Sequence, residues 1–455
     1  MNASFFGELL QTISERGRAL LDRASKRRVA PAKHSDGLVD LCEDLLSRRG
    51  EASGVALARD ILARYNELTT GPRIALFEAM ATRFGTDRER LSAAVERWRQ
   101  DPSDDAIAEL REAAEPRRQE LLRRLNLAPG GTAELVRMRE QLLDAMVHRD
   151  DLDVVDADFV HLFSSWFNRG FLVLRRIDWS TPAIVLEKII RYEAVHRIRG
   201  WDDLRRRIDP ADRRCYAFFH PALVDDPLIF VEVAFTREIP GAIAPILTGQ
   251  REVADPEKAT TAVFYSISNC QRGLAGVSFG HFLIKQVAEE ISREMSNIST
   301  FVTLSPAPGF AAWLAAERAD AASTLLTEED RVALAHLDTQ GWWQMTHLRE
   351  AVQDALSHAA ACYFLYARNK RGTPVDSVAR FHLGNGARLE QIDLLADTSS
   401  NGMSRSHGLM VNYLYDLKNI EKNHEAYAEN RTVVASNAVK RLARTRSREL
   451  VPLGD

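Results

Sequence analysis

Two side chains in the second half of the sequence have the chemical types needed to act on a substrate. The first, Ser305, closes an apolar run and precedes Pro306, and a following proline favours an extended backbone that could project the hydroxyl from a strand end. A nucleophilic serine of the G-x-S-x-G class is not indicated, because that class uses the backbone N–H of the next residue and proline has none. The hydroxyl is therefore predicted to act by hydrogen bonding, and the alternative is a serine that caps the following loop.

The second candidate is His382. The sequence predicts a strand over residues 378–382, followed by a turn at Leu383-Gly384-Asn385-Gly386. Imidazole has an ordinary pKa of about 6.5, so a histidine at a strand end could pass a proton to a substrate at neutral pH. The alternative is a ring held by a turn carbonyl. In another predicted strand, Tyr413 and Tyr415 share one face, which either lines a pocket or packs in the core.

A glycine-rich turn precedes an amphipathic helix pattern that runs from Leu283 to Met295. The turn follows a predicted strand over residues 262–268 and contains Gly273, Gly276 and Gly280. Free backbone N–H groups and the dipole at a helix start attract phosphate when glycines let the ligand come close. The spacing matches neither the P-loop nor the dinucleotide fingerprint, so a tight connection without a ligand is the alternative.

The sequence does not indicate a metal site. His281, His407 and His424 lack the H-E-x-x-H spacing of a zinc-binding helix. The four cysteines are scattered without a C-x-x-C pair, and they are Cys42, Cys215, Cys270 and Cys362. This pattern argues against a structural zinc site or a disulfide framework and favours a reducing compartment.

The composition excludes several classes of protein. The chain has 455 residues, of which 45% are apolar, enough to bury the cores of two or more domains. Its 60 Lys and Arg and 64 Asp and Glu give a net charge of −4, so no overall field attracts nucleic acid or anionic lipid. No apolar run approaches the roughly 20 residues that cross a bilayer. An amphipathic helix pattern over the first 28 residues contains acidic residues, which transit peptides lack. We expect a cytoplasmic protein without nucleic-acid or membrane partners.

The elements that must position these side chains fall into two halves. Helical periodicity dominates from Phe5 to about Ser165, with alternating Glu and Arg that suit solvated or subunit-facing surfaces. Turn residues divide this half into about six to eight helices. They stand at Gly71-Pro72, Gly85-Thr86-Asp87, Asp101-Pro102-Ser103 and Pro129-Gly130-Gly131-Thr132.

Short strands and helices follow after about Trp166, which predicts an α/β or α+β half. Strands are expected at residues 215–220, 228–235, 262–268, 300–304, 378–382, 389–393 and 409–415. Only residues 221–227 separate the first two strands, which favours an antiparallel hairpin. A helical insertion is expected from about Phe310 to Tyr366.

Several separate motifs, in a consistent order, resemble those of the malonyl-CoA decarboxylase family. They are Trp166-Phe167 with Gly170-Phe171-Leu172, Glu193-Ala194-Val195-His196, Arg213-Arg214-Cys215-Tyr216, Phe264-Tyr265-Ser266-Ile267-Ser268, Leu304-Ser305-Pro306 with Pro308-Gly309-Phe310, Phe381-His382-Leu383, Asn385-Gly386-Ala387, and Gly408-Leu409-Met410-Val411-Asn412-Tyr413. The resemblance covers most of the chain after residue 160.

The resemblance implies an α+β protein. Residues 1–165 would form an N-terminal all-α helical bundle that oligomerises, and residues 166–455 a catalytic domain of the GNAT acyltransferase fold with a mixed central sheet. The family's catalytic residues fall on Ser305 and His382. Its substrate contacts, around a turn that cradles the CoA pyrophosphate, fall on Ala275, Gly276, Val277, Ser278, Phe279, Gly280 and His281, with Tyr415 lining the same site. One departure is Ser278, where animal relatives carry an acidic residue.

The activity that the resemblance implies is the decarboxylation of malonyl-CoA to acetyl-CoA and CO₂. Ser305 would position the malonyl group, and His382 would protonate the enolate. The thioester itself takes up the electrons, so no metal or organic cofactor is expected beyond the CoA of the substrate. A CoA-dependent acyltransferase and an inert malonyl-CoA-binding regulator are the alternatives. The assembly habit of the family implies a homo-oligomer, a dimer or a tetramer, formed through the helical domain.

Overall fold

The computed structural model describes residues 35–47, 50–249, 251–277 and 283–444. These residues form two compact units. The first unit contains the described residues up to Leu172, together with His220–Val224 and residues 271–277, and the second contains the others. The amphipathic pattern over the first 28 residues lies outside the described part of the chain. Within that part, no helix is long and apolar enough to cross a membrane.

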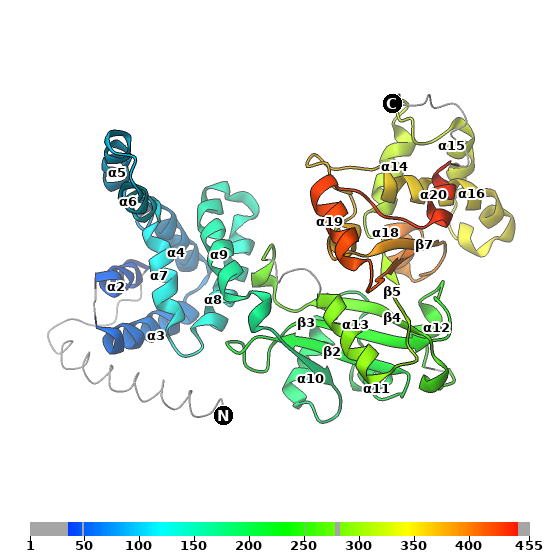
Figure 1. Ribbon diagram of the computed structural model, residues 1–455, viewed down its shortest axis with the longest axis horizontal. Coiled ribbons are helices and arrows are strands. Elements are labelled where there is room, and N and C mark those ends of the chain that lie inside the picture. Colours follow the sequence, from blue (N-terminus) through cyan, green and yellow to red (C-terminus); the bar gives the residue numbers. More distant parts are fainter. Residues whose placement is uncertain (1–34, 48–49, 250, 278–282, 445–455) are drawn as a thin grey trace. The chain divides into compact units, whose positions relative to one another are not determined.

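The first unit is helical, as its periodicity predicts (Figure 1). Its α-helices are α2 (Ser35–Ser47), α3 (Glu51–Glu67), α4 (Thr70–Thr82), α5 (Arg88–Gln100), α6 (Asp104–Ala114), α7 (Arg117–Asn126), α8 (Gly131–Ala145) and α9 (Asp153–Trp166). Short 3₁₀ turns are η1 (Met146–His148), η2 (Asp150–Leu152), η3 (Arg169–Phe171) and η5 (Arg272–Leu274).

Side chains at two of the predicted boundaries cap the helices that follow them. The Asp87 carboxylate accepts hydrogen bonds from the backbone N–H groups of Glu89 and Arg90 at the start of α5. The Ser103 hydroxyl accepts one from Ala106 at the start of α6. Each cap satisfies backbone donors that have no partner within the helix, which typically contributes about 1 kcal/mol. The predicted helix boundaries at these two turns are confirmed.

The second unit is built on a mixed eight-stranded sheet. Its strands are β1 (Val173–Ile177), β2 (Arg213–Phe219), β3 (Pro227–Thr236), β4 (Thr261–Asn269), β5 (Thr300–Thr303), β6 (Ser305–Pro306), β7 (Arg388–Asp393) and β8 (Met410–Leu414). The order is β1-β2-β3-β4-β5-β8-β6, and β7 pairs with β8. Only the β4–β5 pair is parallel among these strands. The α+β class, the mixed sheet and the β2–β3 hairpin agree with the predictions.

Helices connect and flank these strands. They are α10 (Ala183–Tyr192), α11 (Trp201–Ile208), α12 (Ala244–Leu247), α13 (Leu283–Glu294), α14 (Phe310–Ala319), α15 (Glu328–Leu334), α16 (Thr346–Leu365), α17 (Ser377–Gly384), α18 (Ser400–Ser406), α19 (Ile420–Asn430) and α20 (Asn437–Arg444), with 3₁₀ turns η4 (Pro256–Lys258), η6 (Ala335–Asp338) and η7 (Trp342–Gln344). The parallel strands β4 and β5 are joined through α13, whose buried residues follow the predicted apolar positions. The expected helical insertion corresponds to α14, α15 and α16.

One predicted strand is wrong, because residues 378–382 form most of the helix α17. The Asp376 carboxylate caps this helix by accepting a hydrogen bond from the backbone N–H of Ala379. The buried positions Ala379, His382 and Leu383 have the i, i+3, i+4 spacing of a helix rather than the alternation of a strand. His382 therefore lies in the last turn of a helix, and not at the end of a strand.

Candidate active site

The structure brings Ser305 and His382 into direct contact, although 77 positions separate them in the sequence. The Ser305 Oγ and His382 Nε2 atoms are 3.0 Å apart. Ser305 belongs to the two-residue strand β6 and pairs with Val411 of β8. His382 comes from α17, and both side chains are buried, with exposed fractions of 6% and 2%. A serine hydroxyl and an imidazole thus meet in a largely dry environment.

Two tyrosines at the end of β8 hold the imidazole ring on its other sides. The Tyr415 hydroxyl lies 2.8 Å from His382 Nδ1. The ring of Tyr413 stacks on the imidazole, with a centroid distance of 4.6 Å and an interplanar angle of 23°. The shared face predicted for these tyrosines is thus the face that contacts His382. The Tyr413 hydroxyl is buried and has no hydrogen-bond partner among the residues that the structure describes.

A threonine that the sequence analysis did not single out completes the chain of hydrogen bonds. The Ser305 hydroxyl donates to Thr303 Oγ1 at 2.9 Å, and the backbone N–H of Tyr413 donates to the same oxygen at 3.2 Å. Thr303 is fully buried at the end of β5. Its position two residues before Ser305 is the signal that could have revealed it, since alternate residues of an extended chain share a face.

We infer the tautomer of the histidine from the direction of the Ser305 hydrogen bond. Because the Ser305 hydroxyl donates to Thr303, its oxygen is left to accept a hydrogen bond from His382 Nε2–H. Nδ1 is then the unprotonated nitrogen and accepts from the Tyr415 hydroxyl. Burial lowers the pKa of His382 to about 3 and raises the pKa of Tyr415 well above its usual value. At neutral pH the ring is uncharged, and the phenol keeps its proton.

The glycine-rich turn belongs to the first unit, where an arginine of α8 holds it. Arg139 is 2% exposed, and its Nη1 donates to the carbonyl oxygens of Gly273 at 2.9 Å and Ala275 at 2.7 Å. A Cβ atom at Gly273 would lie 2.0 Å from the backbone oxygen of Val136, so only glycine fits there. Gly276 has a φ of +76°, which glycine adopts without strain.

Only some of the predicted substrate contacts belong to the described residues. Ala275 and Gly276 are exposed, and Val277 is buried. Ser278, Phe279, Gly280 and His281 lie outside the described residues. The predicted binding role of this turn stays a prediction, and so do the roles predicted for Ser305, His382 and Tyr415.

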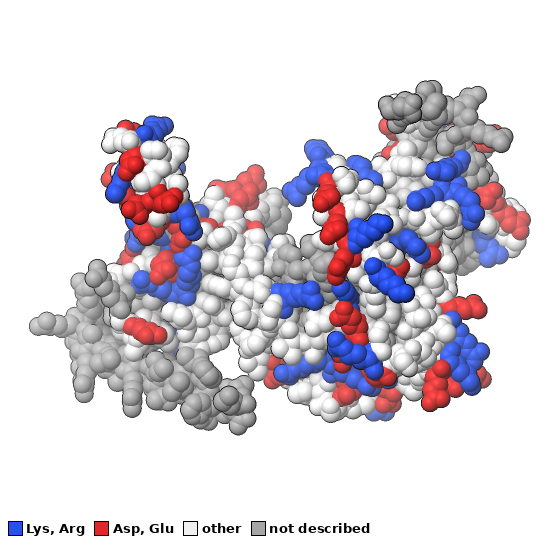
Figure 2. Space-filling view, viewed as in Figure 1, with Lys and Arg blue, Asp and Glu red and all other residues white. Residues whose placement is uncertain are grey.

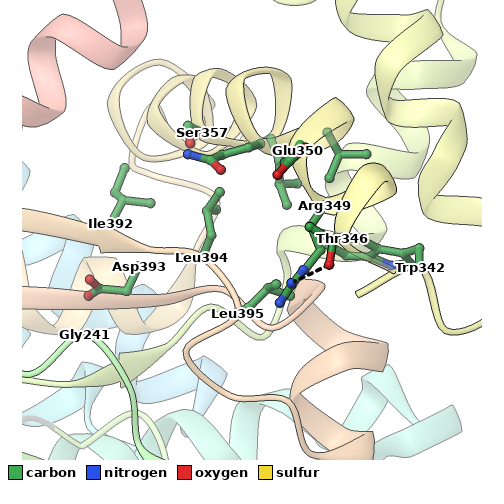
Figure 3. A pocket seen from close by; sticks show the side chains of 13 residues that line it. Gly241, Trp342, Thr346, Arg349, Glu350, Ser357, Ile392, Asp393, Leu394 and Leu395 are labelled. Atoms are coloured by element: carbon green, nitrogen blue, oxygen red, sulfur yellow. Dashed lines mark hydrogen bonds between the residues drawn. The ribbon is translucent and has the colours of Figure 1, made fainter. Parts of the chain in front are cut away.

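A pocket of about 570 Å³ in the second unit is lined by other residues. Figure 3 shows it between α16 and the segment that follows β7, with Arg349, Glu350, Asp393 and Leu395 among the side chains around it. Burial raises the pKa of Asp393 to about 6. None of the predicted site residues lines this pocket, so the hydrogen-bonded histidine is a separate feature of the unit.

The comparison with known proteins agrees with this architecture. The family model of the malonyl-CoA decarboxylase C-terminal domain matches residues 170–451, and that of the N-terminal domain matches residues 84–167. The mitochondrial malonyl-CoA decarboxylase of Anser anser anser is 36% identical over 408 residues, covering 82% of this chain and 81% of that protein.

Solved structures give the same result. The malonyl-CoA decarboxylase from Rhodopseudomonas palustris is 58% identical, with a TM-score of 0.87, and the match covers 90% of this chain and 100% of that one. The corresponding protein from Agrobacterium vitis is 56% identical, with a TM-score of 0.86, over 90% of this chain and 99% of that one. The fold is thus that of a two-part α+β protein with a helical N-terminal region. The chain belongs to the malonyl-CoA decarboxylase family.

Proposed function

We propose that the protein removes CO₂ from malonyl-CoA and releases acetyl-CoA, and that Ser305 and His382 act on the malonyl group. The observation that carries this proposal is the buried chain of hydrogen bonds from Tyr415 through His382 to Ser305, in a chain of the malonyl-CoA decarboxylase family.

The chemistry explains why such residues are useful. When the carboxylate leaves as CO₂, its electron pair moves into the thioester carbonyl and forms an enolate, and carbon 2 must then receive a proton. A hydrogen-bond donor aimed at the developing charge contributes about 3–4 kcal/mol, and a positioned general acid adds about 10²- to 10⁴-fold in rate. The thioester is the electron sink, so the reaction as proposed uses no metal or organic cofactor.

The ionisation of His382 decides how it can deliver a proton. With its pKa lowered to about 3 by burial, the ring holds a single proton on Nε2 at neutral pH. In the proposed mechanism the Nε2 proton passes to carbon 2, and the Tyr415 hydroxyl gives its proton to Nδ1, so the negative charge ends on the phenolate. A proton from water then restores the starting state of the pair. Ser305 orients the malonyl carboxylate by hydrogen bonding, for which its hydroxyl hydrogen turns from Thr303 Oγ1 to the carboxylate.

The sheet offers a place for the extended arm of CoA within the second unit. Strand β5 pairs with β4 only over Thr261–Phe264, whereas β4 continues to Asn269. Beyond Phe264 no described strand pairs with that side of β4, and an extended ligand can hydrogen-bond to an unpaired strand edge. We assign the extended part of the CoA arm to this edge.

The two parts of the chain have different proposed tasks. Residues 166–455 carry the reaction, and residues 1–165 form a homo-oligomer, a dimer or a tetramer, through surface helices. In the first unit, Trp98 of α5 and Ile107 of α6 are 40% and 43% exposed, and large exposed apolar side chains are commonly covered by a partner. The curated relative from Anser anser anser is named as a mitochondrial protein. A cytoplasmic location remains our proposal for this chain.

The test is a reaction with malonyl-CoA and no acyl acceptor, in which acetyl-CoA and CO₂ are followed together. We expect both products in equal amounts from wild type. The variants His382→Asn and Ser305→Ala should be at least about 100-fold slower, whereas His336→Asn, a change at an exposed histidine, should be unaffected. Thermal unfolding would show that each variant is folded.

Two outcomes would contradict the proposal. Product that appears only when an amine acceptor is added would identify an acyltransferase. Intact malonyl-CoA after long incubation, despite measurable binding, would identify a regulator that binds the thioester without converting it.

A further inference from the structure

Three arginines of the second unit lie along the loop over residues 368–375, and their positive charges act on the phenol of Tyr427 on α19. Arg380 lies in α17, Arg431 directly follows α19, and Arg368 lies in the loop after α16. Burial raises the pKa of Tyr427, and the positive charges of Arg380, Arg368 and Arg431 oppose that rise. The Tyr427 hydroxyl makes no hydrogen bond to any described residue. The positive charges of three guanidinium groups thus act on a hydroxyl that has no hydrogen-bond partner among the described residues.

Backbone contacts, rather than carboxylates, hold these arginines in place. Arg380 Nη1 donates to the carbonyl oxygens of Pro374 and Val375, both at 2.7 Å. Arg368 Nη2 donates to the Leu365 carbonyl at 2.6 Å. These bonds fix the direction of the guanidinium groups but leave their charges unbalanced.

The third guanidinium group, that of Arg431, has no hydrogen bond or ion pair within the described residues. A Cβ atom built on Gly372 would lie 2.6 Å from its Nη1. The guanidinium therefore packs directly on the loop backbone at a glycine whose φ is +71°. An arginine placed so closely, without an anionic partner, is available for a ligand.

Within the described residues, no acidic group forms an ion pair with these three arginines. The positive charge of Arg380 opposes the rise in the pKa of Asp376 that burial causes. The Asp376 carboxylate accepts hydrogen bonds from the Tyr363 hydroxyl at 3.0 Å and the Ala379 N–H at 2.8 Å. On α19, Glu421, Glu425 and Glu429 recur every four residues. Their stripe lies on the side of the helix opposite Tyr427, because each residue turns the helix by about 100°. Figure 2 shows Lys and Arg side chains flanking this part of the second unit.

The cluster adjoins the helix that carries His382. Arg380 precedes the histidine by two positions. The Tyr427 ring packs against the last residue of α17, since a Cβ atom at Gly384 would lie 3.8 Å from its Cε1. The neighbouring His424 Nδ1 lies 2.7 Å from the Gly384 carbonyl oxygen. A ligand bound here would therefore contact the element that positions the histidine.

We propose that Arg368, Arg380 and Arg431, together with the Tyr427 hydroxyl, bind a phosphate monoester dianion. Guanidinium forks match the spacing of phosphate oxygens, and hydrogen bonds between charged groups are about twice as strong as neutral ones. A dianionic ligand balances the three positive charges better than a ligand with a single carboxylate does. The phosphate could be the ribose 3′-phosphate of a CoA thioester, which rests on the proposed function, or that of a separate phosphorylated compound.

The experiment uses Arg431→Gln, because this side chain makes no hydrogen bond or ion pair within the described residues and its loss should leave the fold intact. Arg431→Lys keeps the charge without the fork, and Arg405→Gln on α18 removes an exposed arginine elsewhere. Turnover is measured with malonyl-CoA and with malonyl-3′-dephospho-CoA. Binding of inorganic phosphate is measured by calorimetry at low ionic strength.

A 3′-phosphate in the site predicts a KM for the dephospho substrate at least about tenfold above that for malonyl-CoA in wild type and in Arg405→Gln. Arg431→Gln would show nearly equal KM values, and Arg431→Lys an intermediate difference. A separate phosphate ligand predicts equal KM values for both substrates in wild type, with phosphate binding that Arg431→Gln weakens about tenfold. The inference is overturned if wild type has equal KM values for the two substrates and Arg431→Gln binds inorganic phosphate as tightly as wild type does. If wild type does not turn over malonyl-CoA, the proposed function is rejected. The binding of inorganic phosphate to wild type and to Arg431→Gln would still test the phosphate site.

Discussion

The hydroxyls of Tyr413 and Tyr415 are chemically identical, but only one of them has a hydrogen-bond partner among the described residues. The Tyr415 hydroxyl lies 2.8 Å from His382 Nδ1, whereas the Tyr413 hydroxyl is buried and has no such partner there. The two rings are both in contact with the imidazole. Variants of the two tyrosines therefore distinguish the effect of a hydrogen bond to His382 from the effect of ring packing against it.

We predict that Tyr415→Phe lowers kcat about 10- to 100-fold, because it leaves Nδ1 without its donor and frees the ring to change tautomer. The matched variant Tyr413→Phe removes an unsatisfied hydroxyl, so its kcat should stay within about twofold of wild type, and its stability should be equal or higher. Steady-state kinetics and thermal unfolding of both variants provide the measurement. Equal losses in the two variants would mean that packing, and not the hydrogen bond, matters.

The buried imidazole also predicts how stability depends on pH. Above about pH 6.5 the ring is neutral in the folded and unfolded chains, and the free energy of unfolding is unaffected. Below that pH the unfolded chain takes up a proton that the folded protein does not accept until about pH 3. Unfolding is therefore favoured by up to about 1.4 kcal/mol per pH unit as the pH falls through this window.

Between pH 7 and pH 5, wild type should lose about 2 kcal/mol more stability than His382→Gln. Denaturant unfolding at both pH values measures this difference. His196, whose pKa burial lowers to about 4, is present in both proteins and cancels. Parallel pH profiles for the two proteins would show that His382 titrates near its ordinary pKa when folded.

At the scale of single elements, the glycine-rich turn depends on one helix of the first unit. Arg139 of α8 pairs with Asp156, at 2.8 Å between Nε and Oδ1, and donates to two carbonyl oxygens of the turn. A planar guanidinium can make these bonds simultaneously, whereas an ammonium group is a compact point charge. The turn is thus shaped by a residue that lies more than 130 positions away in the sequence.

We predict that Arg139→Lys raises KM for malonyl-CoA about tenfold and changes kcat by less than about threefold, since it loosens the proposed pyrophosphate turn and leaves His382 untouched. The control is Arg137→Lys on the same helix, where the side chain is exposed and paired with Glu134. A loss confined to kcat would place the effect of Arg139 elsewhere than in CoA binding.

The elements also show what sequence patterns can and cannot reveal. Caps at Asp87 and Ser103 made the boundaries of α5 and α6 predictable, because polar residues before an apolar period have a local structural effect. Asp376 gives the same kind of signal before α17, the segment for which the sequence analysis predicts a strand. The contact between Ser305 and His382 depends on long-range pairing of β6, β7 and β8, which local periodicity does not encode. The resemblance, rather than periodicity, brought these residues together in the prediction.

At the scale of the whole molecule, helices α5 and α6 of the first unit leave large apolar side chains exposed. Helices α5 and α6 pack on each other, and ion pairs between them join Arg90 to Glu112 and Arg97 to Glu109. Ala94 is the buried residue of α5, whereas Ala106 and Ala113 are those of α6. Small residues bury little apolar area, so the larger Trp98 and Ile107 are left for another surface.

We predict that wild type has a mass in solution that is a multiple of 51.1 kDa, and that Trp98→Glu with Ile107→Glu lowers it at micromolar concentration. Burying a charge without a partner in an interface costs several kcal/mol, enough to shift association by a factor of 10² or more. Light scattering coupled to size-exclusion chromatography measures the mass. The control Val332→Glu introduces the same charge at a residue of α15 that is 64% exposed and should leave the mass unchanged. A monomeric wild type, or an unchanged mass in the double variant, would exclude this helix pair as the subunit interface. Retained turnover by a monomeric double variant would further show that the site around His382 is complete within one chain.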